Sequence, residues 1–390
     1  MKRITVLLAS AALILTACHP YNKTVNYPDS HFDDLQRILD NPTTPKDVVY
    51  EFTEAAGIGL QGKMFYDTPN PYARIDTAKY KGFTHGEMRQ ANCSSGLTVL
   101  FKTNSSTISV KTKWGWLYNS VATMPIAYRG YDLYIKSPKG NWVWAAAHAT
   151  KPENGEDNLV LIKDMAPGEK ECMLYLPNYC EILSCQIGVE KGASIEKLES
   201  PFRHKIVFHG SSYTHGISTS RAGMSYPMQF MRHTGMQVLP FGMSGNCKLQ
   251  QYFADVLVDV DADAYVFDAF SNPDYKMIKE RLQPFIDKLI AAHPGKPLIF
   301  QQTIRREGRN FNMTLDAKER AKQDMATTLF HQLLKDPKYK DVYFIQTRAF
   351  EPGNHEYSVD GTHPDDHGYY LWSKSIEKPI LKILARYGIR

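Results

Sequence analysis

The chain has 390 residues, of which 43% are hydrophobic, and its formal net charge is +5. This hydrophobic content is ordinary for a globular protein, and a chain of this length usually divides into two domains. The balance of 46 basic and 41 acidic residues is nearly neutral, so nothing in the composition indicates a nucleic-acid-binding protein.

The N-terminus has the features of an export signal. Lys2 and Arg3 precede an apolar run over 4–15, which is too short for a stable transmembrane helix. The run leads into a Leu-Thr-Ala-Cys segment that ends at Cys18 and resembles a bacterial lipobox. The resemblance implies a signal peptide over 1–17, lipidation of Cys18, and an exported, membrane-anchored lipoprotein of the bacterial cell envelope. An ordinary signal peptide with a chance cysteine is the alternative.

The next two regions are expected to be a tether and a β domain. Residues 18–48 are polar, contain proline, and include a short amphipathic piece around 32–39. Over 49–200, short β-branched or aromatic segments are separated by Gly, Pro and Asn. Strands are expected at 97–101, 107–113, 131–135, 142–147, 159–162 and 172–176. Several short strands at this spacing predict a β-sandwich accessory domain.

The pattern changes over 201–390, where short apolar runs alternate with helical stretches. Strands are expected at 205–208, 238–241, 264–267, 297–301 and 342–345, and helices at 277–293, 315–334 and 368–387. This alternation predicts an α/β domain in which helices cover both faces of a parallel sheet. Sites in such sheets lie beyond the C-terminal ends of the strands.

Three residues near these strand ends could form a catalytic triad. Ser212 follows the first strand in a turn of small residues that can expose its hydroxyl, which is a weak nucleophile until a base takes its proton. Asp360 precedes His363 by three residues, so its carboxylate can orient one ring nitrogen while the other faces the serine. These residues supply the nucleophile, the base and the orienting group. Gly245 and Asn272 follow the second and third strands, and can donate a backbone N–H and a side-chain amide to an oxyanion.

These segments together resemble the SGNH hydrolase family of the GDSL type. Ser212, in Gly-Ser-Ser, matches the nucleophile of the first block, Gly245 the second block and Asn272 the third, and Asp360 with His363 matches the last block, Asp-x-x-His. Over about residues 203 to 390, the resemblance implies a flavodoxin-like three-layer α/β/α fold. It also implies an oxyanion hole made of the Ser212 and Gly245 N–H groups and the Asn272 amide.

The chain departs from the family pattern at three positions. Ser211 stands where aspartate is usual, Phe270 where glycine is usual, and Pro273 where aspartate often follows.

In the first half of the chain, 130–134 fits the Gly-x-Asp-Leu-Tyr pattern of a β domain that precedes such hydrolases in bacterial proteins, and 101–105 also looks like that domain. The resemblance implies an accessory sandwich that packs on the hydrolase.

Several other residues have alternative interpretations. His209 and His215 flank Ser212, but neither has a carboxylate at suitable spacing, so His363 is the expected base. Arg305 and Arg306 could bind an anionic substrate, although a solvated loop is the simpler interpretation. A possible metal cluster comprises Asp360, His363, Asp365, Asp366 and His367. Since carboxylates just before a helix commonly cap it, we expect no metal site. Hydrolysis of an ester by a serine triad needs no organic cofactor, so we expect none.

Cysteines and tryptophans also leave alternatives open. Outside the cytoplasm a disulfide is allowed, so Cys180 could pair with Cys185 or Cys172, or these thiols could stay free and buried. Tryptophans that alternate on expected strands could pack in a core or stack on sugar rings; they are Trp114, Trp116, Trp142 and Trp144.

The predicted function is hydrolysis of an O-acyl ester, most simply O-acetyl on a glycan, through an acyl-enzyme. The expected partners are a small acyl ester or an acylated glycan, and the membrane through the anchor at Cys18; nucleic acid is not expected. The glycan rests on family analogy alone. The alternatives are an acyltransferase of the same fold and a non-catalytic carbohydrate-binding lipoprotein.

Overall fold

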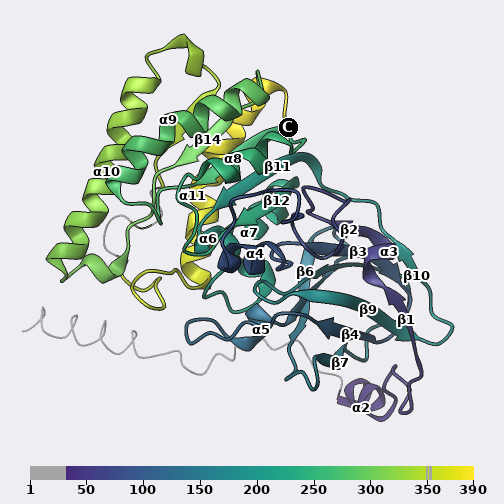
Figure 1. Ribbon diagram of the computed structural model, residues 1–390. Coiled ribbons are helices and arrows are strands. Elements are labelled where there is room, and N and C mark those ends of the chain that lie inside the picture. Colours follow the sequence, from purple (N-terminus) through teal and green to yellow (C-terminus); the bar gives the residue numbers. More distant parts are fainter. Residues whose placement is uncertain (1–31, 348–349, 351–353) are drawn as a thin grey trace, which may run out of the picture.

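The computed structural model describes residues 32–347, 350 and 354–390 (Figure 1). The expected signal peptide, Cys18 and most of the tether lie outside the described residues. The amphipathic piece of the tether forms a short helix, α2 (Phe32–Asp40). Among the described helices, none is long and apolar enough to span a bilayer.

The accessory region consists of two antiparallel sheets. One has the strand order β1-β9-β4-β7, and the other has the order β10-β3-β8-β5-β6, with β2 paired to β3. The strands are β1 (Tyr50–Glu54), β2 (Leu60–Gln61), β3 (Thr98–Thr103), β4 (Ile108–Trp114), β5 (Tyr131–Lys136), β6 (Trp142–His148), β7 (Glu156–Ile162), β8 (Lys170–Tyr175), β9 (Ile182–Glu190) and β10 (Ile195–Lys197). Three short helices complete the region: α3 (Ala55–Gly59), α4 (His85–Ala91) and α5 (Pro125–Tyr128). The predicted β domain is confirmed, and β1, β2, β9 and β10 add to the expected strands.

In the larger of these two sheets, strands β3 and β8 are buried on both faces. Because side chains alternate along a strand, Val99 and Phe101 of β3 enter the core between the two antiparallel sheets, while Leu100 points the other way. On β8, Leu174 enters the core between the two antiparallel sheets and Met173 points the other way. The outward side chains join a core that belongs mainly to the second half of the chain, so the accessory region packs directly on the α/β domain.

The second half of the chain is the predicted three-layer α/β/α domain. All neighbouring strands are parallel, in the order β12-β11-β13-β14-β15. These strands are β11 (Arg203–Gly210), β12 (Met236–Gly242), β13 (Ala264–Asp268), β14 (Leu298–Gln301) and β15 (Val342–Ile345). The helices are α6 (Ser212–His215), α7 (Tyr226–Thr234), α8 (Gln251–Val258), α9 (Tyr275–Ala292), α10 (Met313–Leu333) and α11 (Asp366–Leu384).

Helices cover both faces of the parallel sheet, as expected. Val207 of β11 shares a core with α8, α9 and α10, whereas Ile206 and Phe208 share a core with α7 and α11. In Figure 1 this domain runs from teal through green to yellow, and the accessory sheets are purple to teal. Strands β11, β12 and β13 end at residues 210, 242 and 268, so the segments that follow them emerge at one edge of the sheet.

Candidate active site

Ser212 begins α6 directly after the first strand of the parallel sheet. The Ser211 hydroxyl caps this short helix by accepting a hydrogen bond from the Tyr213 N–H (3.2 Å). A side chain at Gly210 would clash, since a Cβ there would lie 2.1 Å from Thr214 Oγ1. Glycine therefore lets the chain turn sharply from β11 into α6, and the turn brings Ser212 to the edge of the sheet.

His363 and Asp360 meet Ser212 although they are about 150 residues away in the chain. Ser212 Oγ lies 3.0 Å from His363 Nε2, and His363 Nδ1 lies 2.7 Å from Asp360 Oδ2. The other carboxylate oxygen accepts the N–H groups of Thr362 (2.9 Å) and His363 (2.8 Å). Partial burial alone would raise the pKa of Asp360, but the hydrogen bonds from His363 and this backbone lower it. An ionised Asp360 holds the Nδ1 proton, so Nε2 is free to accept the serine proton.

Gly245 and Asn272 line the same cleft as Ser212 and His363. Gly245 has a φ of +71°, a left-handed conformation that favours glycine. The Cys247 N–H donates to Asn272 Oδ1 (3.2 Å), which assigns the amide oxygen and leaves the NH₂ group for the cleft. The structure thus brings all five sequence-predicted site residues together.

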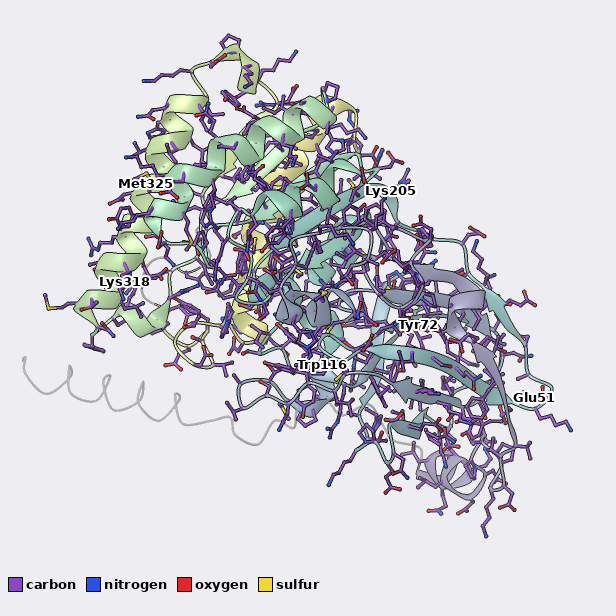
Figure 2. The ribbon with its side chains drawn as sticks, in the orientation of Figure 1. Glu51, Tyr72, Trp116, Lys205, Lys318 and Met325 are labelled. Carbon is purple, nitrogen blue, oxygen red and sulfur yellow. The ribbon has the colours of Figure 1, made fainter. Side chains whose placement is uncertain are left out.

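The cleft is larger than an acetyl ester requires. Its volume is about 1200 Å³, and its walls are the start of α9 and one face of α10. Small side chains such as Ala317 and Ala321 line the α10 wall, and Lys318, labelled in Figure 2, stands on the same helix. Ligand pockets of small molecules commonly occupy 300–1,000 Å³, so this cleft has room for a ligand of several rings.

A buried carboxylate that the sequence analysis did not identify lies beneath the nucleophile. Asp268, at the end of β13, accepts hydrogen bonds at Oδ2 from the Ser211 hydroxyl (2.6 Å) and N–H (3.1 Å). Its Oδ1 accepts from the Ser271 hydroxyl (2.8 Å), next to Asn272. Burial raises the pKa of Asp268 to about 6. Asp268 therefore supplies, from the neighbouring strand, a carboxylate beside the position where the first block lacks its usual one.

The side chain of Arg306 is largely buried, whereas the sequence predicts a solvated loop for it. Its Nε donates to the Tyr213 hydroxyl (2.8 Å), which in turn donates to the carbonyl of Thr362 (2.9 Å). Its Nη1 pairs with the buried Glu319 (3.1 Å). The expectation of a solvated arginine is wrong: Arg306 supports the loop that carries His363.

The other candidate histidines and carboxylates make unrelated contacts. His209 bonds Phe241 O (2.9 Å) and His215 bonds Asn178 O (2.8 Å); burial lowers the pKa of both rings, that of His209 to about 4. Asp365 caps α11 through the Gly368 N–H, and Asp366 accepts the Ser220 N–H (both 2.8 Å). Within residues 32–347, 350 and 354–390, no group of three or more His, Cys, Asp and Glu side chains is arranged to hold a metal.

The structure also shows whether the cysteines pair and where two of the tryptophans lie. The described cysteines are free and buried; they are Cys93, Cys172, Cys180, Cys185 and Cys247. Trp114 packs in the core of the accessory sheets, whereas Trp144 is half exposed and lies under the guanidinium of Arg221.

The Gly-x-Asp-Leu-Tyr segment fastens the accessory region to the α/β domain. Asp132 is fully buried and accepts from Arg221 Nη1 (2.8 Å) and the Gly223 N–H (2.9 Å). The Tyr134 hydroxyl accepts from the same guanidinium nitrogen (2.6 Å). A Cβ at Gly130 would lie 2.2 Å from Ile126 O, so only glycine fits there. The motif therefore serves the contact between the two regions.

Comparisons with known proteins agree with this architecture. A model of the GDSL-like lipase/acylhydrolase family matches residues 203–382, and a model of the GxDLY domain, described as the N-terminus of SGNH-hydrolase-type esterases, matches residues 50–195. A candidate GDSL-like lipase from Bacteroides ovatus has a crystal structure with 36% sequence identity and a TM-score of 0.82, over 86% of this chain and 98% of its own. No curated protein matches the sequence.

More distant solved structures share the fold. A salicylyl-acyltransferase from a tetracycline biosynthetic pathway is 18% identical, with a TM-score of 0.65 over 90% of this chain and 99% of its own. A family two carbohydrate esterase from Clostridium thermocellum, solved with cellohexaose, is 14% identical, with a TM-score of 0.53 over 75% of this chain and 93% of its own.

The parallel sheet, the covering helices and the serine beside a histidine at the strand ends define the class of SGNH-type α/β hydrolases. Within that class, the match to the Bacteroides ovatus structure over nearly its whole length shows the family: the chain belongs to the GDSL-like lipase/acylhydrolase family and carries its GxDLY N-terminal domain.

Proposed function

We propose that the protein is a serine esterase that removes O-acyl groups, most simply O-acetyl, from a glycan. The observation that carries the proposal is the continuous chain of hydrogen bonds from Ser212 Oγ to His363 and on to Asp360, open to a large cleft. The proposed catalytic residues are Ser212, His363 and Asp360, and the proposed oxyanion donors are Ser212 N–H, Gly245 N–H and the Asn272 amide.

In the proposed reaction, Ser212 Oγ attacks the ester carbonyl while His363 Nε2 takes the hydroxyl proton. The carbonyl oxygen becomes an oxyanion held by the three donors. When the intermediate collapses, the bond to the alcohol breaks and His363 returns the proton to that alcohol. Water then attacks the acyl-enzyme while His363 takes its proton. The bond between the acyl carbon and Ser212 Oγ breaks, His363 returns the proton to Oγ, and the acid leaves. The proposal needs no metal or organic cofactor.

The glycan is supported by the size of the cleft and by the family two carbohydrate esterases among the structures that share the fold. The test is acetate release from a panel of acetylated polysaccharides, with Ser212→Ala as the matched control. We expect release by the wild-type protein and none above background from Ser212→Ala. Transfer of acetyl to an added sugar would instead indicate an acyltransferase, and glycan binding without turnover of any ester would indicate a non-catalytic binding protein.

Anchoring at Cys18 is a separate proposal, which rests on the Leu-Thr-Ala-Cys segment and the basic, apolar leader before it. A wild-type protein expressed with its leader should enter the membrane fraction, and Cys18→Ser should not. Equal membrane association of the two proteins would contradict a lipid anchor.

A further inference from the structure

The peptide group between Ser244 and Gly245 is held in part from outside the α/β domain. Two side chains donate to the carbonyl of Ser244: Gln90 Nε2 (2.9 Å), from α4 of the accessory region, and Asn246 Nδ2 (2.9 Å), from the same loop. A peptide group is planar and trans, so its C=O and N–H point in opposite directions. A donor that fixes the Ser244 carbonyl therefore also fixes the direction of the Gly245 N–H.

Arg74 joins the same two segments at a second point. Its Nη1 donates to the carbonyl of Gly242 (2.8 Å), the last residue of β12, and its Nη2 donates to the carbonyl of Gln90 (2.6 Å). Its Nε donates to Cys93 O (3.1 Å), and the side chain is completely buried. Burial lowers the pKa of Arg74 to about 10, so it stays charged at neutral pH. Arg74 thus ties the end of α4 to the start of the loop that carries Gly245.

The accessory region holds the nucleophile helix as well. The Ser95 hydroxyl donates to the carbonyl of His215 (2.7 Å), and the Tyr179 ring stacks on the His215 ring at 4.0 Å. His215 is the last residue of α6, which begins at Ser212. Figure 1 shows α4 close to α6 in this view, in agreement with these hydrogen bonds.

Polar and charged side chains make these contacts, and Arg74 and Ser95 are buried. Gln90 Oε1 and His215 Nδ1 are buried without a hydrogen-bond partner in the described part of the chain, and Arg74 is a buried cation bound only to carbonyls there. An unsatisfied buried polar group costs roughly 1–3 kcal/mol, and a buried charge is costly unless it is paired. Apolar side chains would be enough to hold the two regions together. We therefore infer that the polar contacts have a further role.

We propose that the accessory domain is a working part of the active site, and that Gln90, held by Arg74, is a positioning residue for the oxyanion hole. Gln90 orients the Ser244–Gly245 peptide so that the Gly245 N–H faces the cleft. Its hydrogen bond to the carbonyl also polarises the peptide, which strengthens the N–H as a donor. This inference rests on the proposed esterase function, because it assigns a role within the same oxyanion hole.

The test is the variant Gln90→Met, which keeps the length of the side chain and removes its donor. Loss of a whole oxyanion donor costs about 10²–10³ in kcat, so misdirecting one should lower kcat on an aryl acetate by roughly 10-fold, with KM nearly unchanged. The matched control is Tyr80→Phe, which removes a hydrogen bond between the same two regions (Tyr80 OH to Asp259, 2.9 Å) away from the cleft. We expect wild-type kcat from the control.

Wild-type kcat in Gln90→Met, or an equal loss in Gln90→Met and Tyr80→Phe, would overturn the inference. Gln90 would then only help to hold the accessory domain on the α/β domain. If Gln90→Met fails to fold, Gln90→Glu keeps the shape and replaces the donor by an acceptor. A folded Gln90→Glu should lose at least as much kcat, and wild-type kcat there would equally overturn the inference. A wild-type protein without activity on any ester would contradict the proposed function instead.

Discussion

Two loops meet at Ser212, and different parts of the molecule hold them. The loop that carries His363 is partly exposed and depends on its own domain: Gly308 N–H donates to Gly361 O (2.7 Å), and the Tyr213 hydroxyl donates to Thr362 O (2.9 Å). The loop that carries Gly245 follows a buried strand, and two side chains of the accessory domain, Arg74 and Gln90, add to the hydrogen bonds that the α/β domain itself makes to this loop.

The difference follows from the work assigned to each loop. His363 must take up and release a proton in every turnover, and its loop lies at the surface, where water can reach it. The oxyanion donors change no bond and act by being fixed before charge develops, so they gain from a rigid, buried support. The accessory domain contributes to that support for the loop that carries Gly245.

The largest effect is expected on the exposed loop, at His363. The variant His363→Asn removes the proposed base, and loss of a triad member lowers kcat by about 10⁴-fold or more. The measurement is kcat on an aryl acetate at neutral pH, with circular dichroism to verify folding. A variant that keeps more than a tenth of the wild-type rate would show that another group takes the serine proton.

A smaller loss is expected on the donor side, at Asn272. The variant Asn272→Ala removes one donor and should lower kcat by about 10²–10³-fold while KM changes little. Gln90→Met should then fall between Asn272→Ala and the wild type, because it misdirects a donor without removing one. A reversed order of these two variants would contradict the assignment of Asn272 to the oxyanion hole.

Asp268, which accepts hydrogen bonds from Ser211 next to the nucleophile, gives a prediction about pH and stability. Burial raises its pKa from 3.8 to about 6 in the folded protein, so the folded state binds a proton more tightly than the unfolded state. Its contribution to stability is therefore fully present below about pH 4 and is lost as the pH rises through 6, by up to about 3 kcal/mol. The free energy of unfolding of the wild type, relative to Asp268→Asn, should fall over this window; a constant difference would mean that Asp268 does not titrate there.

The smallest effect is expected at Tyr213, which links Arg306 to the His363 loop. The variant Tyr213→Phe removes both hydrogen bonds of the hydroxyl and leaves Arg306 Nε without this partner, so stability should fall by about 1–3 kcal/mol. Because Thr362 adjoins His363, we expect a modest drop in kcat as well. Thermal unfolding and aryl acetate kinetics, compared with Tyr80→Phe, would show whether the effect belongs to this loop; equal effects in the two variants would contradict it.

The sequence predicts the reacting groups better than the groups that support them. Ser212, Gly245 and Asn272 each follow an apolar strand, and the rule that sites lie at the carboxyl ends of parallel strands places them together. Gln90 and Arg74 act on carbonyls 154 and 168 residues away, and no local pattern indicates such contacts. Asp268 could have been suspected, because Ser211 lacks the usual acidic side chain and a strand end nearby carries one.

Some elements of the fold have weak sequence signals. The segment of β9 alternates apolar and polar residues, a period of two that is typical of a strand, but it is less apolar than the strands around it. Helices α7 and α8 span nine and eight residues, too short for a clear helical period. Their hydrophobic faces can be recognised only once the parallel sheet on which they pack is known.

The most direct test of the central claim is covalent trapping of the nucleophile. A fluorophosphonate reacts with a serine that a neighbouring histidine activates, and peptide mass spectrometry locates the adduct. We expect one adduct, on Ser212, together with loss of aryl acetate hydrolysis, and no labelling of Ser212→Ala or His363→Asn. Labelling at another residue, or equal labelling of Ser212→Ala, would contradict the assignment of Ser212 as the nucleophile.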